Sequence, residues 1–248
     1  MQQYQLGVPA FGPIVKKLLI INVAVWLGLI LVLQDMILNS TVIYEWFALT
    51  PLNFTMEFQI WTPLTYMFLH ASSIGHILFN MLVLWMFGSE LEYRWGSKFF
   101  LTYYMVCGVG AALLYSLVAF IYYWSSGDYF PLQTPVIGAS GAIYGLLVAY
   151  GLVFGERVIH FMLIFPMKAK YFAMILGGIA FISTLQSGFG SNVAHMAHRG
   201  GGIVGYLYLK FGGNITSFFK TKSSKSRGRK LRLVVKNDDS KSGPKYWN

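Results

Sequence analysis

Long apolar stretches dominate the chain, and shorter polar or aromatic connections separate them. A helix needs about 20 residues to cross the roughly 30 Å hydrocarbon core of a bilayer. Stretches of about this length predict six transmembrane helices, at residues 18–38, 74–91, 99–123, 138–154, 171–186 and 193–211. The first is not expected to be a cleaved signal peptide, because its apolar core is long and no small-residue cleavage site follows it. The pattern therefore predicts an all-α membrane protein with a bundle of six helices.

Composition excludes the other broad classes of protein. Hydrophobic residues make up 56% of the 248 residues and charged residues only 11%, whereas charged residues make up roughly 25% of soluble domains. The apolar blocks are also too long for the alternating strands of a membrane β-barrel. The single cysteine, Cys107, excludes a disulfide or a thiolate metal site. No cofactor and no metal are expected.

Basic residues indicate how the chain lies in the membrane, because Lys and Arg in short loops stay preferentially in the cytoplasm. Those in or beside the short loops are Lys16, Lys17, Arg94, Lys98, Arg157, Lys168, Lys170 and Lys210. The connections 39–73, 124–137 and 187–192 contain neither Lys nor Arg. We therefore expect a multi-pass protein of the cell (inner) membrane with both termini in the cytoplasm. The second, fourth and sixth helices then enter from the outside.

The tail carries most of the net charge of +10. From Lys220 onward it contains 10 of the 19 Lys and Arg residues, with only Asp238 and Asp239 as acids. The sequence therefore divides into a membrane domain, residues 1–212, and a basic, disordered cytoplasmic tail, residues 213–248. Because the tail directly follows the last span, we expect it to bind anionic lipids of the inner leaflet and no nucleic acid.

Two connections are predicted to have structure of their own. The first outer loop is expected to lie partly in the headgroup layer, because it is rich in aromatic residues: Tyr44, Trp46, Phe47, Phe54, Phe58, Trp61, Tyr66 and Phe68. His70 is expected to brace this loop by hydrogen bonding. The apolar run 158–165 is too short to cross a membrane, and it predicts a cytoplasmic hairpin that turns at Pro166.

A few polar side chains lie inside the predicted spans, where such groups mark function more often than packing. His76 and Asn80 are four residues apart and share one face of the second helix. Ser140 opens the fourth helix and His198 lies near the start of the sixth. Since these helices all enter from the outside, the four side chains are predicted to lie at a similar depth.

Glycines predict how the fourth and sixth helices pack. Gly141 and Gly145 form one small-xxx-small pair, and Gly201 and Gly205 form another. Such pairs allow two helix backbones to approach closely, which would bring Ser140 and His198 together. Gly138 and Gly141, on either side of Ser140, leave its hydroxyl accessible.

A serine hydroxyl beside a neutral imidazole is the minimum apparatus for nucleophilic acyl transfer. Ser140 would be the nucleophile and His198 the base. The resulting oxyanion needs donors, which the His76 ring, the Asn80 amide and the Ser140 N–H could supply. Tyr144, one turn after Ser140, could hold the His198 imidazole by ring stacking.

These motifs resemble the rhomboid intramembrane serine proteases over roughly residues 14–212. The matching motifs are His76-Ile-Leu-Phe-Asn80, Gly138-Ala-Ser-Gly141 followed by Tyr144, and His198 followed by Gly201 and Gly205. Glu92-Tyr-Arg94 with Gly96 is also similar to the family. The resemblance implies a six-helix rhomboid core and serine endopeptidase activity near the outer leaflet, with transmembrane helices of membrane proteins as substrates and the lipid bilayer as surroundings.

Two residues depart from the family pattern. The first outer loop has Trp61-Thr62 where relatives commonly have Trp-Arg, and Arg199 stands where an apolar residue is usual after the helix 6 histidine. The alternative function is a catalytically weak or silent rhomboid-like protein that binds transmembrane helices. A transporter or proton channel stays open as well, because intramembrane histidines can relay protons. Metalloproteases and aspartyl proteases are excluded, because the chain has no His-Glu-x-x-His and no pair of buried aspartates.

Overall fold

The computed structural model describes residues 9–161, 165–172, 174–175 and 193–211, with the side chains of 159–161, 165 and 193–199 left undescribed. Its first long helix is α1 (Pro13–Val25), which continues without a break into the wider π-helical turns of η1 (Trp26–Leu38). The helix starts earlier than the predicted residue 18. Glu92 explains the difference, because its buried carboxylate accepts the N–H groups of Ile14 and Val15, each at 2.9 Å. A carboxylate satisfies the free N–H groups and the positive dipole at a helix start.

Two further long helices follow. α5 (Ile74–Val83), η3 (Leu84–Gly88) and α6 (Ser89–Trp95) form one continuous rod, and α7 (Ser97–Ser126) forms the next. Gly96, between α6 and α7, has a φ of 86°, which favours glycine. In the described residues three helices are long and apolar enough to cross a membrane: Pro13–Leu38, Ile74–Trp95 and Ser97–Ser126. The prediction of a multi-pass membrane protein is confirmed.

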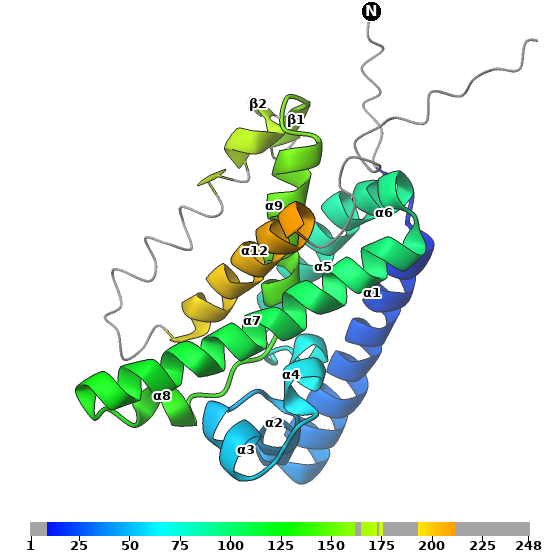
Figure 1. The fold of residues 1–248 in the computed structure, drawn as a ribbon. Helices are drawn as coiled ribbons and strands as arrows, with labels where there is room; N and C mark the ends of the chain where they lie inside the picture. Colours follow the sequence, from blue (N-terminus) through cyan, green and yellow to red (C-terminus); the bar gives the residue numbers. More distant parts are fainter. Residues whose placement is uncertain (1–8, 162–164, 173, 176–192, 212–248) are drawn as a thin grey trace, which may run out of the picture.

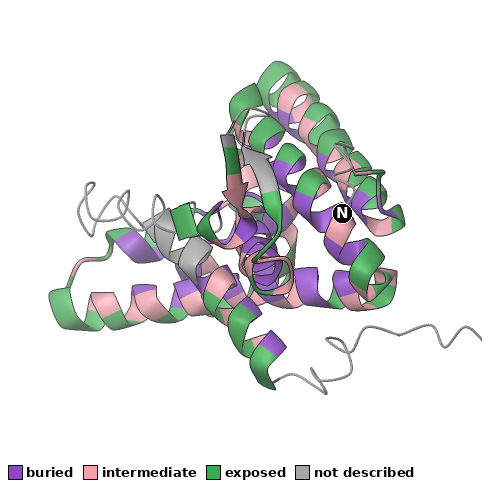
Figure 2. Cartoon of the chain, turned by 90° about the horizontal axis from the view of Figure 1, so that it is seen from above, coloured by how far each residue is buried: buried purple, intermediate pink, exposed green. Residues whose placement is uncertain are grey.

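The outer faces of these helices are apolar. Figure 2 shows buried residues on the inward faces of the bundle and exposed residues around its outside. The large exposed apolar residues include Ile20, Leu27, Val32, Leu78, Phe79, Leu117 and Ile121. Soluble monomers rarely expose an apolar surface of this extent, whereas lipid tails would cover it at no cost.

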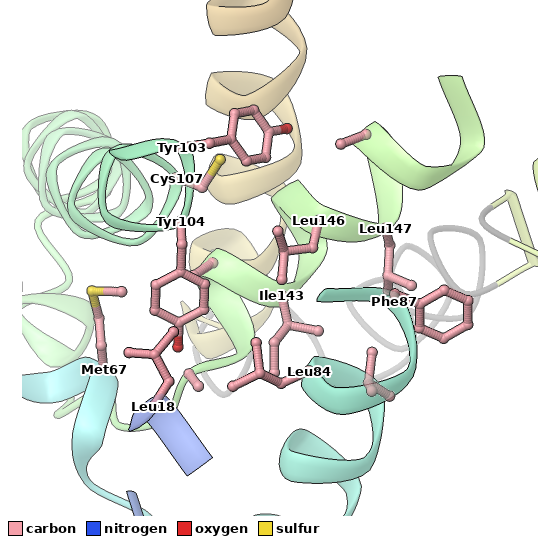
Figure 3. Packing of buried hydrophobic residues seen from close by; sticks show 14 of the residues in the cluster. Leu18, Met67, Leu84, Phe87, Tyr103, Tyr104, Cys107, Ile143, Leu146 and Leu147 are labelled. Carbon is pink, nitrogen blue, oxygen red and sulfur yellow. The ribbon is translucent and has the colours of Figure 1, made fainter. Parts of the chain in front are cut away.

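Two further helices pack in the middle of the bundle. α9 (Ser140–Val153) and α12 (Val193–Phe211) pack against each other and against α7. α9 begins two residues later than predicted, because Gly138 has a φ of 117°, outside the helical region. Figure 3 shows the core beside α9, where Ile143, Leu146 and Leu147 pack among side chains from α1, α5–η3 and α7.

One end of the bundle is built from short helices (Figure 1). They are α2 (Val42–Phe47), α3 (Pro51–Met56), α4 (Thr62–Thr65), η2 (Tyr66–Phe68) and α8 (Phe130–Gln133). That this loop lies partly in the headgroup layer stays a prediction. Trp46 and Trp61 stack at 6.4 Å between ring centroids and are exposed. Tyr66 departs from that prediction. It is buried, and its hydroxyl donates to the Gly108 carbonyl oxygen at 2.7 Å.

The opposite end carries the hairpin and the described ion pairs. β1 (Val158–Phe161) and β2 (Phe165–Lys168) pair antiparallel. The predicted hairpin is therefore confirmed, but its turn is not at Pro166, which lies inside β2 opposite His160. Arg157 pairs with Glu90 on α6, and Lys168 and Lys170 pair with Glu156. The start of α1 lies at this end too (Figure 1), so the Lys and Arg residues of the described body, apart from Arg199 on α12, gather on one side.

Candidate active site

The segment before α9 determines where Ser140 lies. Val136 and Leu49 exchange both backbone hydrogen bonds, at 2.8 and 3.0 Å. Two residues later, the Gly138 N–H donates to the Tyr66 carbonyl oxygen at 2.9 Å. The segment between η1 and α5, residues 39–73, therefore anchors this stretch of chain, and Ser140 becomes the first residue of α9. The first turn of a helix has N–H groups without intrahelical partners, so Ser140 lies at a natural site for negative charge.

His76 reaches this helix start from α5. A Cβ placed on Gly138 would lie 3.0 Å from His76 Nε2 and 3.6 Å from Ser140 Oγ. Both side chains therefore border the space that Gly138 leaves empty. The structure thus brings His76 and Ser140 together, as their predicted depths require.

A second contact determines how the His76 ring is protonated. Its Nδ1 accepts the Ala71 N–H at 3.2 Å. A nitrogen that accepts a hydrogen bond carries no proton, so a neutral His76 carries its proton on Nε2. The Nε2–H donor is on the side of the ring that borders Gly138 and Ser140.

Asn80 lies one turn along α5 from His76 and is buried. Its side-chain nitrogen donates to the His76 carbonyl oxygen at 2.8 Å. An amide nitrogen has two hydrogens, so this bond orients the group and leaves a second N–H for another acceptor.

Glycines join α9 to α12 as predicted. A Cβ on Gly201 would overlap the Gly141 carbonyl oxygen, and one on Gly205 would lie 3.0 Å from the Gly145 Cα. Gly141 thus meets Gly201, and Gly145 meets Gly205 one turn further along both helices. The two helices therefore run in the same direction at this crossing.

Position 198 lies on α12 one turn before Gly201, and on the same side of the helix as Gly201 and Gly205. The side chains of His198 and Arg199 lie outside the described residues. Tyr144 is half-buried on α9, one turn after Ser140. Its stacking against His198 stays a prediction.

His70 does not brace the loop as predicted. Its ring is fully buried, and neither ring nitrogen makes a hydrogen bond of normal geometry within the described part of the chain. The ring packs against His76 instead, with 5.1 Å between centroids. Burial lowers the pKa of His70 to about 4, and the nearby His76 adds to the shift.

The sequence analysis missed the backbone groups that hold the site. The Ala71 N–H orients His76, and the Tyr66 carbonyl oxygen anchors Gly138. No side-chain pattern identifies such groups. The only signal was indirect, since Ala71 and Tyr66 lie shortly before His76 in the sequence.

Comparisons with known proteins show which family the chain belongs to. The Rhomboid domain family matches residues 57–214. The chain is 29% identical over 196 residues to the rhomboid protease GlpG of Yersinia pseudotuberculosis, an alignment that covers 79% of this chain and 61% of that protein. It is 31% identical over 153 residues to the rhomboid protease GlpG of Haemophilus influenzae, covering 60% and 68% of the two chains. The chain thus spans less than two thirds of the length of the Yersinia relative. The matched domain covers most of the chain and contains every candidate site residue. The protein therefore belongs to the rhomboid family.

Proposed function

We propose that this protein is an intramembrane serine endopeptidase that cleaves transmembrane segments of membrane proteins. One observation carries the proposal: His76 Nε2 and Ser140 Oγ border the same empty space at the start of α9. A carbonyl group entering that space would meet a nucleophile and an N–H donor together. The rhomboid proteases among its relatives support the same reaction class.

His198 is the proposed general base. It would take the Ser140 proton as Oγ attacks the substrate carbonyl carbon, and then give that proton to the leaving amine. Water would hydrolyse the resulting acyl-enzyme by the same steps in reverse order. The packing of α9 and α12 supports the pairing, because the two helices run in the same direction and Gly141, next to Ser140, meets Gly201, three residues after position 198.

The negative oxygen of the tetrahedral intermediate needs donors already in position. His76 supplies Nε2–H, because the Ala71 N–H occupies its other nitrogen. Asn80 supplies its second amide N–H, and the backbone N–H of Ser140 completes the set. Gly138 leaves room for the substrate, and Tyr144 would support the His198 ring.

Six spans and cytoplasmic termini are part of the proposal. Because α9 and α12 run in the same direction, the chain has to return across the bundle between Val153 and Val193. The predicted span 171–186 would provide that crossing, and nearly all of it lies outside the described residues. Basic residues at the end that holds α6 and the hairpin support a cytoplasmic position of that end. With this orientation, the protein would reside in the inner membrane.

The membrane domain would end near residue 212, and the basic tail, which also lies outside the described residues, would bind anionic inner-leaflet lipids. The site lies toward the opposite, outer end. Cleavage would therefore fall near the outer end of a substrate helix.

The second candidate is a catalytically silent rhomboid-like protein that holds transmembrane helices. Arg199 favours it, because family members usually have an apolar residue there. The presence of both Ser140 and His198 favours the protease.

A cleavage assay separates the two. The full chain in liposomes is incubated with a single-pass substrate that carries glycine near the outer end of its helix, and products are resolved on a gel. Ser140→Ala and His198→Ala should each abolish cleavage, because the nucleophile and base act as one unit. Ser116→Ala is the matched control, since this buried serine on α7 only donates to the Ala112 carbonyl oxygen.

A serine-reactive fluorophosphonate probe gives the second readout. It should label the unmodified chain and Ser116→Ala but not Ser140→Ala. Full cleavage by Ser140→Ala would disprove the mechanism. Absence of both cleavage and labelling in the unmodified chain would favour the silent binder.

A further inference from the structure

One peptide unit links α2 to His76. The Tyr44 hydroxyl, on α2, donates to the His70 carbonyl oxygen at 2.9 Å. The Ala71 N–H of the same peptide unit donates to His76 Nδ1 at 3.2 Å. In a trans peptide the C=O and N–H point in opposite directions. Tyr44, the His70–Ala71 peptide and His76 therefore form one continuous chain of hydrogen bonds.

Such a chain has a direction. A donor on the carbonyl oxygen polarises the amide, so its N–H becomes a stronger donor at the other end. That N–H selects the His76 tautomer with its proton on Nε2. The Tyr44 pKa is raised, chiefly by burial and further by the nearby Asp35 carboxylate. The hydroxyl therefore stays protonated and able to donate throughout the neutral range.

Tyr44 is itself held in place. Its backbone N–H donates to Gln34 Oε1 at 3.2 Å, on η1. The neighbouring residue Asp35 accepts the Ser72 hydroxyl at 2.5 Å. The first long helix thus fixes both Tyr44 and the segment that carries the peptide unit.

We infer that Tyr44 is a positioning residue for the oxyanion site: through the His70–Ala71 peptide it keeps the Nε2–H of His76 directed toward Ser140. This inference rests on the proposed function, because it assumes that His76 donates to the oxyanion. Tyr44 itself contacts neither Ser140 nor the substrate. Its effect reaches the reaction only through the tautomer and orientation of His76.

A simple bracing role is the competing explanation, and Trp26 provides the matched control. Its Nε1–H donates to the Ala71 carbonyl oxygen at 2.9 Å. This bond holds the same segment but belongs to the next peptide unit, which has no contact with His76 Nδ1. If bracing were all that mattered, Tyr44→Phe and Trp26→Phe would have similar effects.

The experiment compares Tyr44→Phe, Trp26→Phe and Tyr93→Phe in the full chain. Tyr93 also donates its hydroxyl to a backbone carbonyl oxygen, that of Phe11, but at the opposite end of the bundle. Tyr44→Phe should lower kcat about five- to ten-fold, roughly the value of one hydrogen bond, with KM unchanged. Trp26→Phe and Tyr93→Phe should keep kcat within about two-fold, because neither bond polarises the N–H that reaches His76.

The second readout is the ¹⁵N spectrum of the histidine rings in the uniformly ¹⁵N-histidine-labelled chain, with His76 assigned through His76→Asn. Tyr44→Phe should move the His76 signals toward a mixture of tautomers, whereas the two controls should leave them in place. This readout needs no activity, so it still tests the inference if Ser140→Ala shows that the proposed function is wrong.

The inference is overturned if Tyr44→Phe leaves kcat and the His76 signals unchanged, or if Trp26→Phe changes both as much. Should Tyr44→Phe fail to fold, 3-fluorotyrosine at position 44 keeps the ring and makes its hydroxyl a stronger donor. The His76 Nδ1 signal must then shift, and an unchanged signal overturns the inference as well.

Discussion

His76 and Ser140 border the same space, which is empty because residue 138 is a glycine. His76 comes from α5 and Ser140 from α9, and a Cβ on the intervening Gly138 would lie 3.0 Å from His76 Nε2. Access to Ser140 therefore depends on the absence of a side chain at Gly138 as much as on the catalytic groups.

Gly138→Ala should reduce cleavage by about two orders of magnitude or more, because the methyl group would displace the His76 ring. The φ of 117° at this position also strains any L side chain, at a cost of about 1–3 kcal/mol. Gel-based cleavage and thermal unfolding in detergent measure the two effects. Gly75→Ala is the control, since nothing lies within 4 Å of a Cβ there. Normal cleavage by Gly138→Ala would mean that the substrate carbonyl does not enter this space.

Gly201→Ala should destabilise the protein more than Gly202→Ala does. A Cβ at position 201 would overlap the Gly141 carbonyl oxygen, whereas at position 202 the nearest atom is Val148 Cγ2 at 3.4 Å, an ordinary contact. Separating the two helices also moves His198 away from Ser140, so cleavage should fall with stability. Thermal unfolding midpoints of the two variants make the comparison. Equal midpoints would show that α9 and α12 do not pack this closely in the bilayer.

His70 should make stability depend on pH. Its pKa is lowered from 6.5 to about 4 in the folded state, mainly by burial, so between these values the unfolded state binds more protons. Stability should therefore fall as the pH drops from about 6.5 to about 4, by roughly 3 kcal/mol at most, and this loss should level off below pH 4. His70→Phe, which cannot titrate, should lose less stability over that window. Unfolding midpoints measured from pH 7 to pH 4 test this, and parallel curves for the two proteins would contradict it.

Arg199→Leu should raise both thermal stability and turnover. Position 199 shares a face of α12 with Ile203 and Tyr206, both exposed on the outside of the bundle. An arginine on a lipid-facing surface costs roughly 2.5–3.5 kcal/mol at the middle of a span and less near the interface. Snorkelling toward the headgroups would pull the start of the helix, and His198 with it, out of position.

Arg199→Lys is the control for that prediction, because it keeps the charge and should bring no gain. If Arg199→Leu is instead less stable and less active, Arg199 has a native partner. The geometry assumed for the first turns of α12 would then need revision.

The sequence by itself determined the long helices and one of their contacts. In lipid every backbone N–H and C=O has to bond within its own segment, so long apolar runs could only become helices. The pairs Gly141–Gly145 and Gly201–Gly205 predicted the α9–α12 contact, because only glycine permits that approach. The helix ends were less certain from sequence. α1 begins at Pro13, where Glu92 accepts N–H groups of its first turn, and α7 runs on to Ser126, where Gly127 with a φ of 73° ends it.

Only the tertiary structure decided the finer points. Glu92 caps a helix start 78 residues earlier in the chain, and Pro166 lies within a strand rather than at its turn. The Ala71 N–H determines which nitrogen of His76 carries the proton. The Tyr66 carbonyl oxygen anchors Gly138. Every non-proline residue carries the same backbone N–H and C=O. Their role at one position therefore depends on which segments fold together, and the identity of the residue does not reveal it.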